Sequence, residues 1–304
     1  MRLAVIDIGT NSIRLDIYQV YPNGHFVRLH RSKNSVRLGE DVFIKGKLCT
    51  QGVKRAFRTL REFKMLCDNL CVEQIRTTAT AALRQASNAE KFIAKIKKRL
   101  GIEIEIITGL KEAELILAGI RLDPRTNDGV IGFIDIGGGS TEIGVFEGEK
   151  IHFLESFPVG AIKLEQLYFK NGNIIGARNY ILETFKAPKL PNIDLMLGSS
   201  GTIKSIHRIL QKTASVQEVE LKLFNGLIEK LTALPLEQRK IYPGMTPGRA
   251  DIIVPGTLIL QEAMVFFRTP TLSFTPYALR DGLLVSEISE IKRGQAREKL
   301  KRLK

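Results

Sequence analysis

Apolar residues recur along this chain at two alternating spacings. Residues 3–20 have the pattern of two consecutive strands, with an apolar run before a glycine turn and strict alternation at Ile13, Leu15 and Ile17 after it. From residue 50 to residue 70 the apolar positions instead return every three or four residues, as at Val53 and Phe57, which predicts an amphipathic helix. Strand-like and helix-like segments keep alternating toward the C-terminus, and this succession is typical of an α/β protein.

The same reasoning assigns elements to most of the chain. We expect strands over residues 3–20, 26–29, 74–78, 102–107, 130–133, 193–197 and 272–274. We expect helices over residues 50–70, 89–100, 110–118, 162–169, 174–185, 203–210, 216–231 and 252–267, and a terminal helix from residue 279. The turn-rich stretch 122–129 predicts a boundary between two lobes, 1–124 and 125–304, with the terminal helix (about 290–304) packing back on the first lobe.

One short segment occurs twice. IDIGTNS at residues 6–12 returns as IDIGGGS at residues 134–140, so that Asp, Gly and Ser fall in register, and both copies lie between two strands. The tip of such a hairpin offers backbone N–H groups and a hydroxyl, a concave set of donors that suits phosphate oxygens. Two copies at the starts of two lobes predict one anionic ligand held in the cleft between them.

Two further segments could complete this cleft. GSSGT at residues 198–202 lies between a strand and a helix, where free N–H groups and the helix dipole favour an anion, although it could also be an ordinary turn. Near the lobe boundary, Glu112 lies in a first helical turn and is a candidate for orienting or deprotonating a water. Asp135 is the natural magnesium ligand, Asp7 is its counterpart, and Arg84 is either a phosphate clamp or a surface ion-pair partner.

Composition and charge narrow the class of protein. A formal net charge of +14 favours an anionic partner, or simply keeps the protein in solution. No aromatic RNA-reading motif or zinc-finger spacing is present, so we expect no sequence-specific nucleic acid as partner, and the three cysteines lack the neighbours of a zinc site. No apolar run is long enough to cross a bilayer, so no membrane partner is expected, and the immediate start of a strand leaves no room for a signal peptide. The expected location is cytoplasmic.

The motifs together resemble the exopolyphosphatase/guanosine pentaphosphate phosphatase family, a branch of the actin-like, sugar-kinase and heat-shock ATPase superfamily. Eight blocks carry the resemblance: IDIGTNSIRL at 6–15, VRLG at 36–39, TAALRQASN at 80–88, IITGLKEA at 106–113, IDIGGGSTE at 134–142, GSSGTIK at 198–204, RADIIVPG at 249–256 and ALRDG at 278–282. The resemblance implies two actin-like (ribonuclease H-like) lobes with mixed sheets flanked by helices, and an active site in the interlobe cleft. The chain is similar to the short, two-domain members, for which a homodimer is plausible.

The resemblance also implies a reaction and the residues that perform it. The implied activity is release of terminal phosphate from polyphosphate or guanosine pentaphosphate, with magnesium as cofactor. By position Glu112 matches the family's base, Arg84 its phosphate-binding arginine, and Asp135 and Glu142 the acidic residues of its second loop, which we expect to be catalytic and to hold the metal. The candidate phosphate-binding residues are Gly9, Thr10, Asn11, Ser12 and Arg14 in the first loop, Gly137, Gly138, Gly139, Ser140 and Thr141 in the second, and Gly198, Ser199, Ser200, Gly201 and Thr202 in the third.

The chain departs from the family pattern at two places. Lys111 and Glu114 exchange the charges that the family usually has around its base. Asp16 replaces an apolar strand residue, and Arg14, on the same face of that strand, is its expected partner. Two other functions stay open at this point: a kinase or ATPase on the same superfold, and a non-catalytic sensor of polyphosphate or the alarmone.

Overall fold

Two mixed β-sheets form the framework of the molecule. The computed structural model describes residues 1–214 and 218–302. The first sheet has the order β3-β2-β1-β4-β5, with strands β1 (Arg2–Ile8), β2 (Ser12–Val20), β3 (Phe26–Ser35), β4 (Gln74–Ala79) and β5 (Glu105–Ile106). The second has the order β10-β11-β9-β6-β7-β8, with β6 (Ile131–Ile136), β7 (Thr141–Glu147), β8 (Lys150–Phe157), β9 (Leu195–Ser199), β10 (Val219–Glu220) and β11 (Thr271–Phe274).

The two sheets share one topology. In each, the strand that opens the repeated segment pairs antiparallel with the next strand and parallel with a later one, so that β1 lies between β2 and β4 and β6 lies between β7 and β9. The repeated sequence therefore corresponds to a repeated structural unit, and the predicted class of two mixed sheets flanked by helices is confirmed. Below, the first lobe denotes the first sheet with α1 to α4, and the second lobe denotes the second sheet with α6 to α11.

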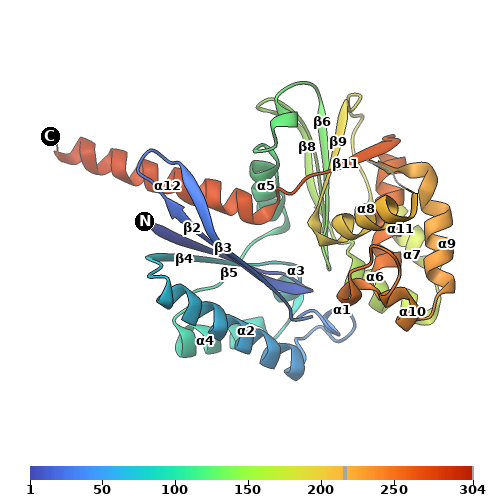
Figure 1. The fold of residues 1–304 in the computed structure, drawn as a ribbon, viewed down its shortest axis with the longest axis horizontal. Coiled ribbons are helices and arrows are strands. Elements are labelled where there is room, and N and C mark those ends of the chain that lie inside the picture. The colour runs from blue at the N-terminus through green and yellow to red at the C-terminus, as the bar shows by residue number, and fades with distance from the viewer. Residues whose placement is uncertain (215–217, 303–304) are drawn as a thin grey trace.

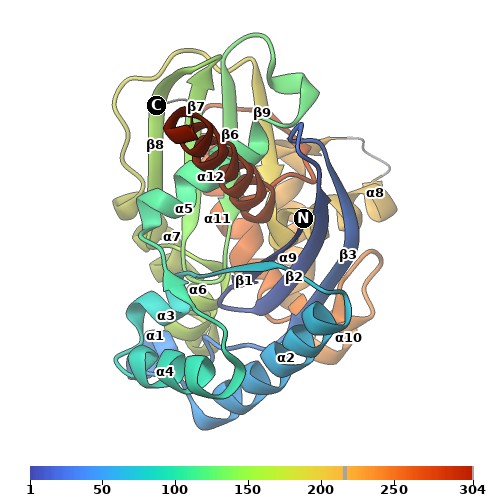
Figure 2. The same cartoon turned by 90° about the vertical axis from the view of Figure 1, so that its left-hand side faces the viewer.

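Helices cover both sheets, as Figures 1 and 2 show. They are α1 (Val42–Lys45), α2 (Thr50–Asn69), α3 (Ala81–Gln85), α4 (Ala89–Leu100), α5 (Gly109–Ile120), α6 (Ala161–Leu167), α7 (Ile174–Thr184), α8 (Ser200–Ala214), α9 (Phe224–Ala233), α10 (Leu236–Lys240), α11 (Ile253–Phe266) and α12 (Leu279–Arg302). Helices α2 and α4 cover the outer face of the first sheet, and helices α6, α7, α8, α9 and α11 pack on the far face of the second.

Each lobe has a core between its sheet and its helices, and alternation along the strands produces a further, central core between the two sheets. On β1, Ile6 and Ile8 face α2 and α4, whereas Leu3 and Val5 point to the opposite side, as the period of two requires. There they meet Phe133 of the second sheet and the apolar residues of α5 and α12. Helices α5 and α12 thus join the two lobes into one packed body.

The terminal helix begins at Leu279, the residue from which the sequence predicts it. Its residues Leu283, Leu284 and Ile288 pack in the central core with Leu3 and Val20 of the first sheet. The predicted packing of the last part of residues 290–304 lies outside the described side chains from residue 294 on. The lobe boundary placed between residues 124 and 125 falls in a 3₁₀ turn, Pro124–Thr126, and stays a proposal.

Three sequence-based assignments need correction. The helix predicted over residues 216–231 begins outside the described residues. At residues 219–220 it is wrong, because Val219 pairs with Leu272 as an edge strand, and residues 221–223 form a 3₁₀ turn before α9 begins at Phe224. The predicted strand 102–107 is reduced to Glu105–Ile106, since Ile102 is buried in the core without joining the sheet. Strand β3 extends six residues beyond the predicted 26–29, and β8 was not predicted at all.

No helix within residues 1–214 and 218–302 has both the length and the hydropathy that a bilayer crossing needs.

Candidate active site

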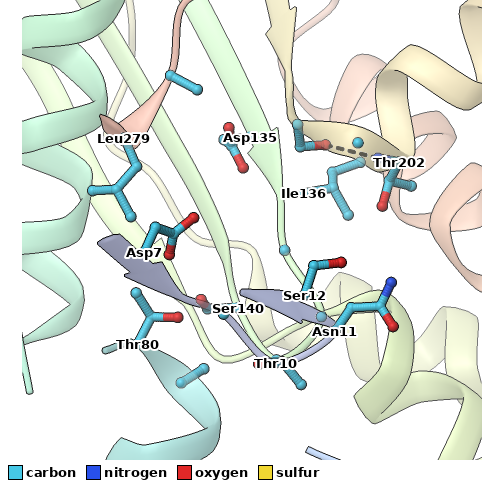
Figure 3. A pocket seen from close by; sticks show the side chains of 18 of the residues that line it. Asp7, Thr10, Asn11, Ser12, Thr80, Asp135, Ile136, Ser140, Thr202 and Leu279 are labelled. Atoms are coloured by element: carbon cyan, nitrogen blue, oxygen red, sulfur yellow. Dashed lines mark hydrogen bonds between the residues drawn. The ribbon is translucent and has the colours of Figure 1, made fainter. Parts of the chain in front are cut away.

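A cavity lies where the two repeated hairpins meet (Figure 3). Its wall draws on both sheets, on the start of α8 and on the start of α12. The lining residues include Asp7, Gly9, Thr10, Asn11, Ser12, Arg14, Thr80, Glu112, Asp135, Gly137, Gly138, Gly139, Ser140, Ser200, Gly201, Thr202 and Arg249. Most of the residues proposed from the sequence therefore come together at one place, as expected for an interlobe site.

The two hairpin tips have the same backbone turn. The N–H of Gly9 donates to the carbonyl of Ser12 at 3.1 Å, and the N–H of Gly137 donates to that of Ser140 at 2.9 Å. The tips also touch, since a Cβ on Gly138 would lie 2.8 Å from Cβ of Thr10. Only glycine allows this approach.

Two unpaired polar atoms lie in the first hairpin beside the cavity. The side-chain oxygens Oδ1 of Asn11 and Oγ of Ser12 are buried and lack a hydrogen-bond partner among the described residues. Buried polar groups are nearly always paired, so these two atoms are suited to bind a ligand group or a water in the cavity.

The third loop is built differently from the expectation. The hydroxyl of Ser200 accepts from the N–H groups of Thr202 and Ile203, at 3.2 and 3.3 Å, and so caps the helix itself. Gly198 packs in the core against Leu272, and Ser199 donates its hydroxyl to the carboxylate of Asp135. Within the third loop the cavity is lined by Ser200, Gly201 and Thr202 alone.

Arg249 is a cavity residue that the sequence reasoning missed. Its Nη1 donates to Oγ1 of Thr202 at 3.1 Å, and its guanidinium lies so close to Gly201 that a Cβ there would be 2.2 Å from Nη2. Burial, followed by the charge of Arg14, lowers the pKa of Arg249 to about 10. The sequence contained a signal for this residue, because Arg249 is the first residue of one of the eight family blocks. That block, however, has no glycine turn or other local feature typical of phosphate binding.

Glu112 is a buried carboxylate in the cavity wall. It belongs to the first turn of α5, whose N-terminus is capped by Thr108, the acceptor for the N–H of Lys111 at 3.1 Å. Burial, and then the charge of Glu142, raise the pKa of Glu112 well above its usual range, whereas Arg84 opposes the shift. A carboxylate with a raised pKa is a stronger base and is suited to accept a proton.

Arg84 lies behind Glu112. Its Nη1 donates to Oε2 of Glu112 at 3.2 Å and to the carbonyl oxygen of Ile107 at 2.8 Å, and Arg84 does not line the cavity. Arg84 does not form an exposed surface salt bridge either, because its partner Glu112 is only 7% exposed. The position favours a residue that holds Glu112 over one that clamps a phosphate directly.

Glu142 also lies outside the cavity wall. Ser156 donates to its Oε1 at 2.7 Å, and the Glu142 side chain is buried. Burial and the charge of Asp135 raise the pKa of Glu142 to about 7. Thr141 is likewise occupied elsewhere, since its hydroxyl donates to the carbonyl of Val159 at 2.6 Å.

Besides Glu112, the described acidic residues that line the cavity are Asp7 and Asp135, from matching positions of the two sheets. Burial raises the pKa of each, and the charge of Asp7 adds to the shift of Asp135. Two such carboxylates are hard oxygen donors that a divalent cation would relieve of repulsion. Within residues 1–214 and 218–302, however, no group of three or more His, Cys, Asp or Glu side chains is placed to hold a metal.

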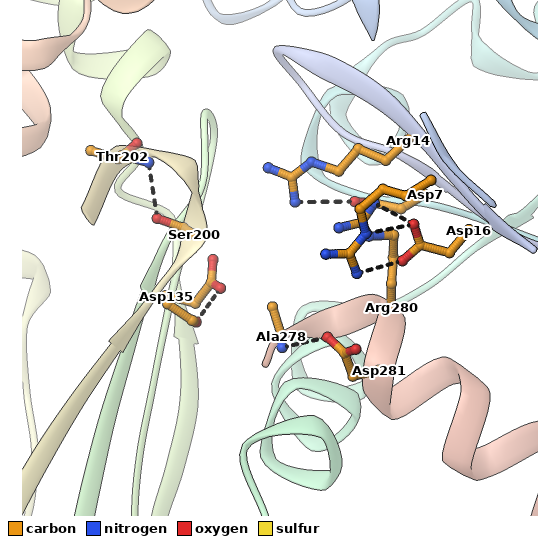
Figure 4. A network of polar contacts seen from close by, with 11 residues as sticks. Asp7, Arg14, Asp16, Asp135, Ser200, Thr202, Ala278, Arg280 and Asp281 are labelled. Atoms are coloured by element: carbon orange, nitrogen blue, oxygen red, sulfur yellow. Dashed lines mark hydrogen bonds and ion pairs between the residues drawn. The ribbon is translucent and has the colours of Figure 1, made fainter. Parts of the chain in front are cut away.

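The expected ion pair between Arg14 and Asp16 is wrong. Asp16 accepts from Nε and Nη2 of Arg31 at 2.9 and 2.8 Å. It also accepts from Arg280 at 3.4 Å (Figure 4). Asp16 pairs with Arg31 rather than with Arg14 because Arg31 lies directly opposite it in the β2–β3 register and reaches both carboxylate oxygens. Arg14 instead lies 3.8 Å from Asp7, at the cavity.

Cations from several elements lie near the cavity residues Arg14 and Arg249. Lys33 faces Arg14 across the β2–β3 pair, and the charges of Arg249, Arg14, Arg280 and Lys204 all act on it. Loss of hydration and then these four charges lower the pKa of Lys33 to about 7. Such a concentration of positive charge favours a multiply charged anion.

Comparison with known proteins identifies the family of this chain. The model of the Ppx/GppA phosphatase family matches residues 17–291. The chain belongs to that family. This confirms the resemblance described from the sequence.

Relatives and solved structures agree over nearly the whole length. The chain is 26% identical to exopolyphosphatase 1 of Mycobacterium bovis over 97% of this chain and 91% of that protein, and 25% identical to exopolyphosphatase 1 of Mycobacterium leprae over 97% and 92%. The structure of an exopolyphosphatase from Cytophaga hutchinsonii superposes with a TM-score of 0.85 at 27% identity, covering 95% of this chain and 98% of that one. The Ppx/GppA member from Aquifex aeolicus gives 0.75 at 27% identity, with the same coverage.

Proposed function

We propose that this chain hydrolyses the terminal phosphoanhydride bond of inorganic polyphosphate. The observation that carries the proposal is the buried carboxylate of Glu112 in the wall of a cavity formed by the two phosphate-type hairpins. Family membership and the exopolyphosphatase relatives support the same substrate. Guanosine pentaphosphate, with its terminal phosphate in the same chemical setting, is the second substrate that we expect.

In the proposed reaction Glu112 accepts a proton from a water whose oxygen bonds to the terminal phosphorus. The bond from that phosphorus to the bridging oxygen breaks, inorganic phosphate forms, and the shortened chain leaves with the electron pair. Arg84 fixes the Glu112 carboxylate through its 3.2 Å contact. The hairpin N–H groups, Arg14 and Arg249 stabilise the charge that develops on the phosphate oxygens.

Magnesium fits this arrangement at a place slightly different from the expected one. We propose Asp7 and Asp135 as its protein ligands, because both line the cavity, whereas Glu142 does not. When bound, the ion would neutralise charge on the phosphate oxygens. The cytoplasm is the expected compartment, and a homodimer remains an expectation from the family.

The direct test is phosphate release from the purified chain with magnesium. Long polyphosphate, guanosine pentaphosphate and ATP are supplied separately, and inorganic phosphate is quantified. We expect release from polyphosphate, and from the alarmone, at rates well above that from ATP. Turnover of ATP at a rival rate would instead indicate an actin-fold kinase or ATPase, and tight polyphosphate binding without release would indicate a sensor.

The low pKa of Lys33 predicts a pH-dependent affinity. A lysine is charged below its pKa, so a rise of pH from 7 to 9 should neutralise Lys33 in the free protein and weaken substrate binding. We expect KM for polyphosphate to rise by about tenfold over this range, the value of one charged hydrogen bond. The Lys33→Arg variant stays charged and should show a flat KM, whereas Lys33→Met should show the high KM throughout. If KM depends on pH in the same way in all three proteins, Lys33 does not contribute to substrate binding.

A further inference from the structure

The outer face of the first lobe carries two rows of basic side chains. On α2, Lys54, Arg58 and Arg61 follow the spacing i, i+4, i+7, which places them on one face of the helix. On α4, Lys91, Lys95 and Lys98 repeat that spacing. All six side chains are exposed, and we call them together the α2–α4 basic face.

The two rows lie side by side. Helices α2 and α4 are neighbours in both views of Figures 1 and 2, and they pack against each other over the first sheet. The ammonium of Lys95 lies 5.4 Å from the ring centroid of Phe57, which joins the α4 row to the α2 row at its centre. Because Leu60 and Phe92 face the core, the basic rows face outward.

The six cations have no ion-pair partner among the described residues, unlike their neighbours on the same helices. Arg55 pairs with Glu40 at 2.6 Å and Lys97 with Glu103 at 2.7 Å. The two helices together contain ten Lys and Arg but three Asp and Glu, so they hold half of the formal net charge of +14. Neighbouring like charges repel, and a bound polyanion would relieve this repulsion.

The surroundings favour a polyanion without bases. Proteins that bind single-stranded nucleic acid stack the bases on exposed aromatic rings. The aromatic ring between the two rows is Phe57, which is half-buried and covered by Lys95. A chain of phosphates needs only cations.

One short helix links the basic face to the wall of the active-site cavity along the chain. Ala81 lines the cavity, α3 runs from Ala81 to Gln85, and α4 begins at Ala89. We propose that the α2–α4 basic face binds the distal part of a long polyphosphate chain whose end occupies the cavity. This inference rests on the proposed function and adds to it a preference for long chains. The second contact raises the effective concentration of the chain at the cavity without a change in the chemical step.

The test is a charge-neutralised variant assayed on a long and a short substrate. Lys54→Gln, Arg58→Gln, Lys91→Gln and Lys95→Gln are combined, and KM is measured for polyphosphate of several hundred units and for tripolyphosphate at low salt. We expect KM for the long chain to rise by about tenfold or more, in line with the gain from a linked second site. KM and kcat for tripolyphosphate should stay unchanged. Thermal unfolding of both proteins checks that the variant is folded.

A matched control removes the same charge elsewhere. Lys186, Lys189, Lys212 and Lys230 are exposed on the second lobe, and their combined replacement by glutamine should leave KM for the long chain near the wild-type value. If both quadruple variants lose affinity equally, net charge alone is responsible and the proposal is overturned. It is also overturned if the α2–α4 variant matches the wild type on long chains.

Direct binding separates this proposal from the proposed function. Long polyphosphate is titrated into the Glu112→Gln protein with and without the four α2–α4 substitutions, so no hydrolysis is required. Absence of phosphate release by the wild type, with binding that depends on the basic face, would contradict the proposed function alone. Tighter binding of single-stranded RNA, or of vesicles of phosphatidylserine and phosphatidylcholine, would overturn polyphosphate as the partner of this face.

Discussion

Glu112→Gln is expected to lower the rate of phosphate release from polyphosphate by about 10³-fold, the middle of the range for loss of a general base. Glutamine keeps the shape of the side chain and can still contact Arg84, but it cannot accept a proton from water. Because Glu112 lines the cavity and is only 7% exposed, bulk solvent does not offer a substitute base at the same position. The measurement is kcat at saturating polyphosphate.

Glu114→Gln is the matched control for this change. Glu114 lies two residues further along α5, about half exposed, and pairs with Lys111 at 3.3 Å away from the cavity wall. Its replacement should leave kcat within about twofold of the wild type, as expected for a surface ion pair. Loss of activity in Glu114→Gln, with Glu112→Gln still active, would transfer the proposed role to Glu114.

The stability of the Glu112→Gln protein follows from the sign of the pKa shift. A carboxyl group whose pKa is raised in the folded state opposes folding at pH values above its usual pKa, because the unfolded chain ionises more easily. The amide removes this cost, so the melting temperature at pH 8 should be no lower than that of the wild type. A large drop in melting temperature would mean that lost activity reflects unfolding.

Gly282→Ala is expected to destabilise the protein by about 3 kcal/mol, the upper part of the range for overpacking. Gly282 lies where α12 crosses α5, and a Cβ there would be 1.7 Å from the carbonyl oxygen of Leu115. That oxygen belongs to the backbone, so the clash requires the helices to separate. Since Glu112 lies one turn before Leu115, we also expect lower activity. The measurement is the midpoint of urea unfolding.

Gly226→Ala is the control for this substitution. Gly226 lies in α9, and a Cβ on it would meet no atom within 4 Å. Alanine is the better helix former, so this variant should gain about 0.5–1 kcal/mol. If Gly282→Ala unfolds at the same urea concentration as the wild type, the crossing of α5 and α12 is looser than the structure indicates.

Local pattern was sufficient for much of the architecture. The repeated segment at residues 6–12 and 134–140 predicted two matching hairpins, and they are present with the same turn. The helical spacing of residues 50–70 predicted α2 to within one residue. Such features follow from the chain's own periodicity, since the side chains that a strand or helix buries recur at fixed intervals.

Local pattern failed where a partner distant in the sequence decided the structure. Residues 219–220 have a helix-compatible spacing, yet they pair with β11 as an edge strand because Leu272 and Thr271 offer them ladder partners. Arg14 and Asp16 share a strand face, yet Asp16 pairs with Arg31 and Arg280, which arrive from β3 and α12. Neither outcome can be read from neighbours along the chain.

The sequence by itself determined the α/β class, the family, the two hairpins and the carboxylate at residue 112. Only the tertiary structure decided which side chains meet at the cavity: it brought Arg249 to Thr202, turned Glu142 toward Ser156 and placed Arg84 behind Glu112. The physical reason is the same in each case. Periodicity encodes which face of an element is buried, whereas contacts across a cleft depend on how two sheets and the helices between them pack.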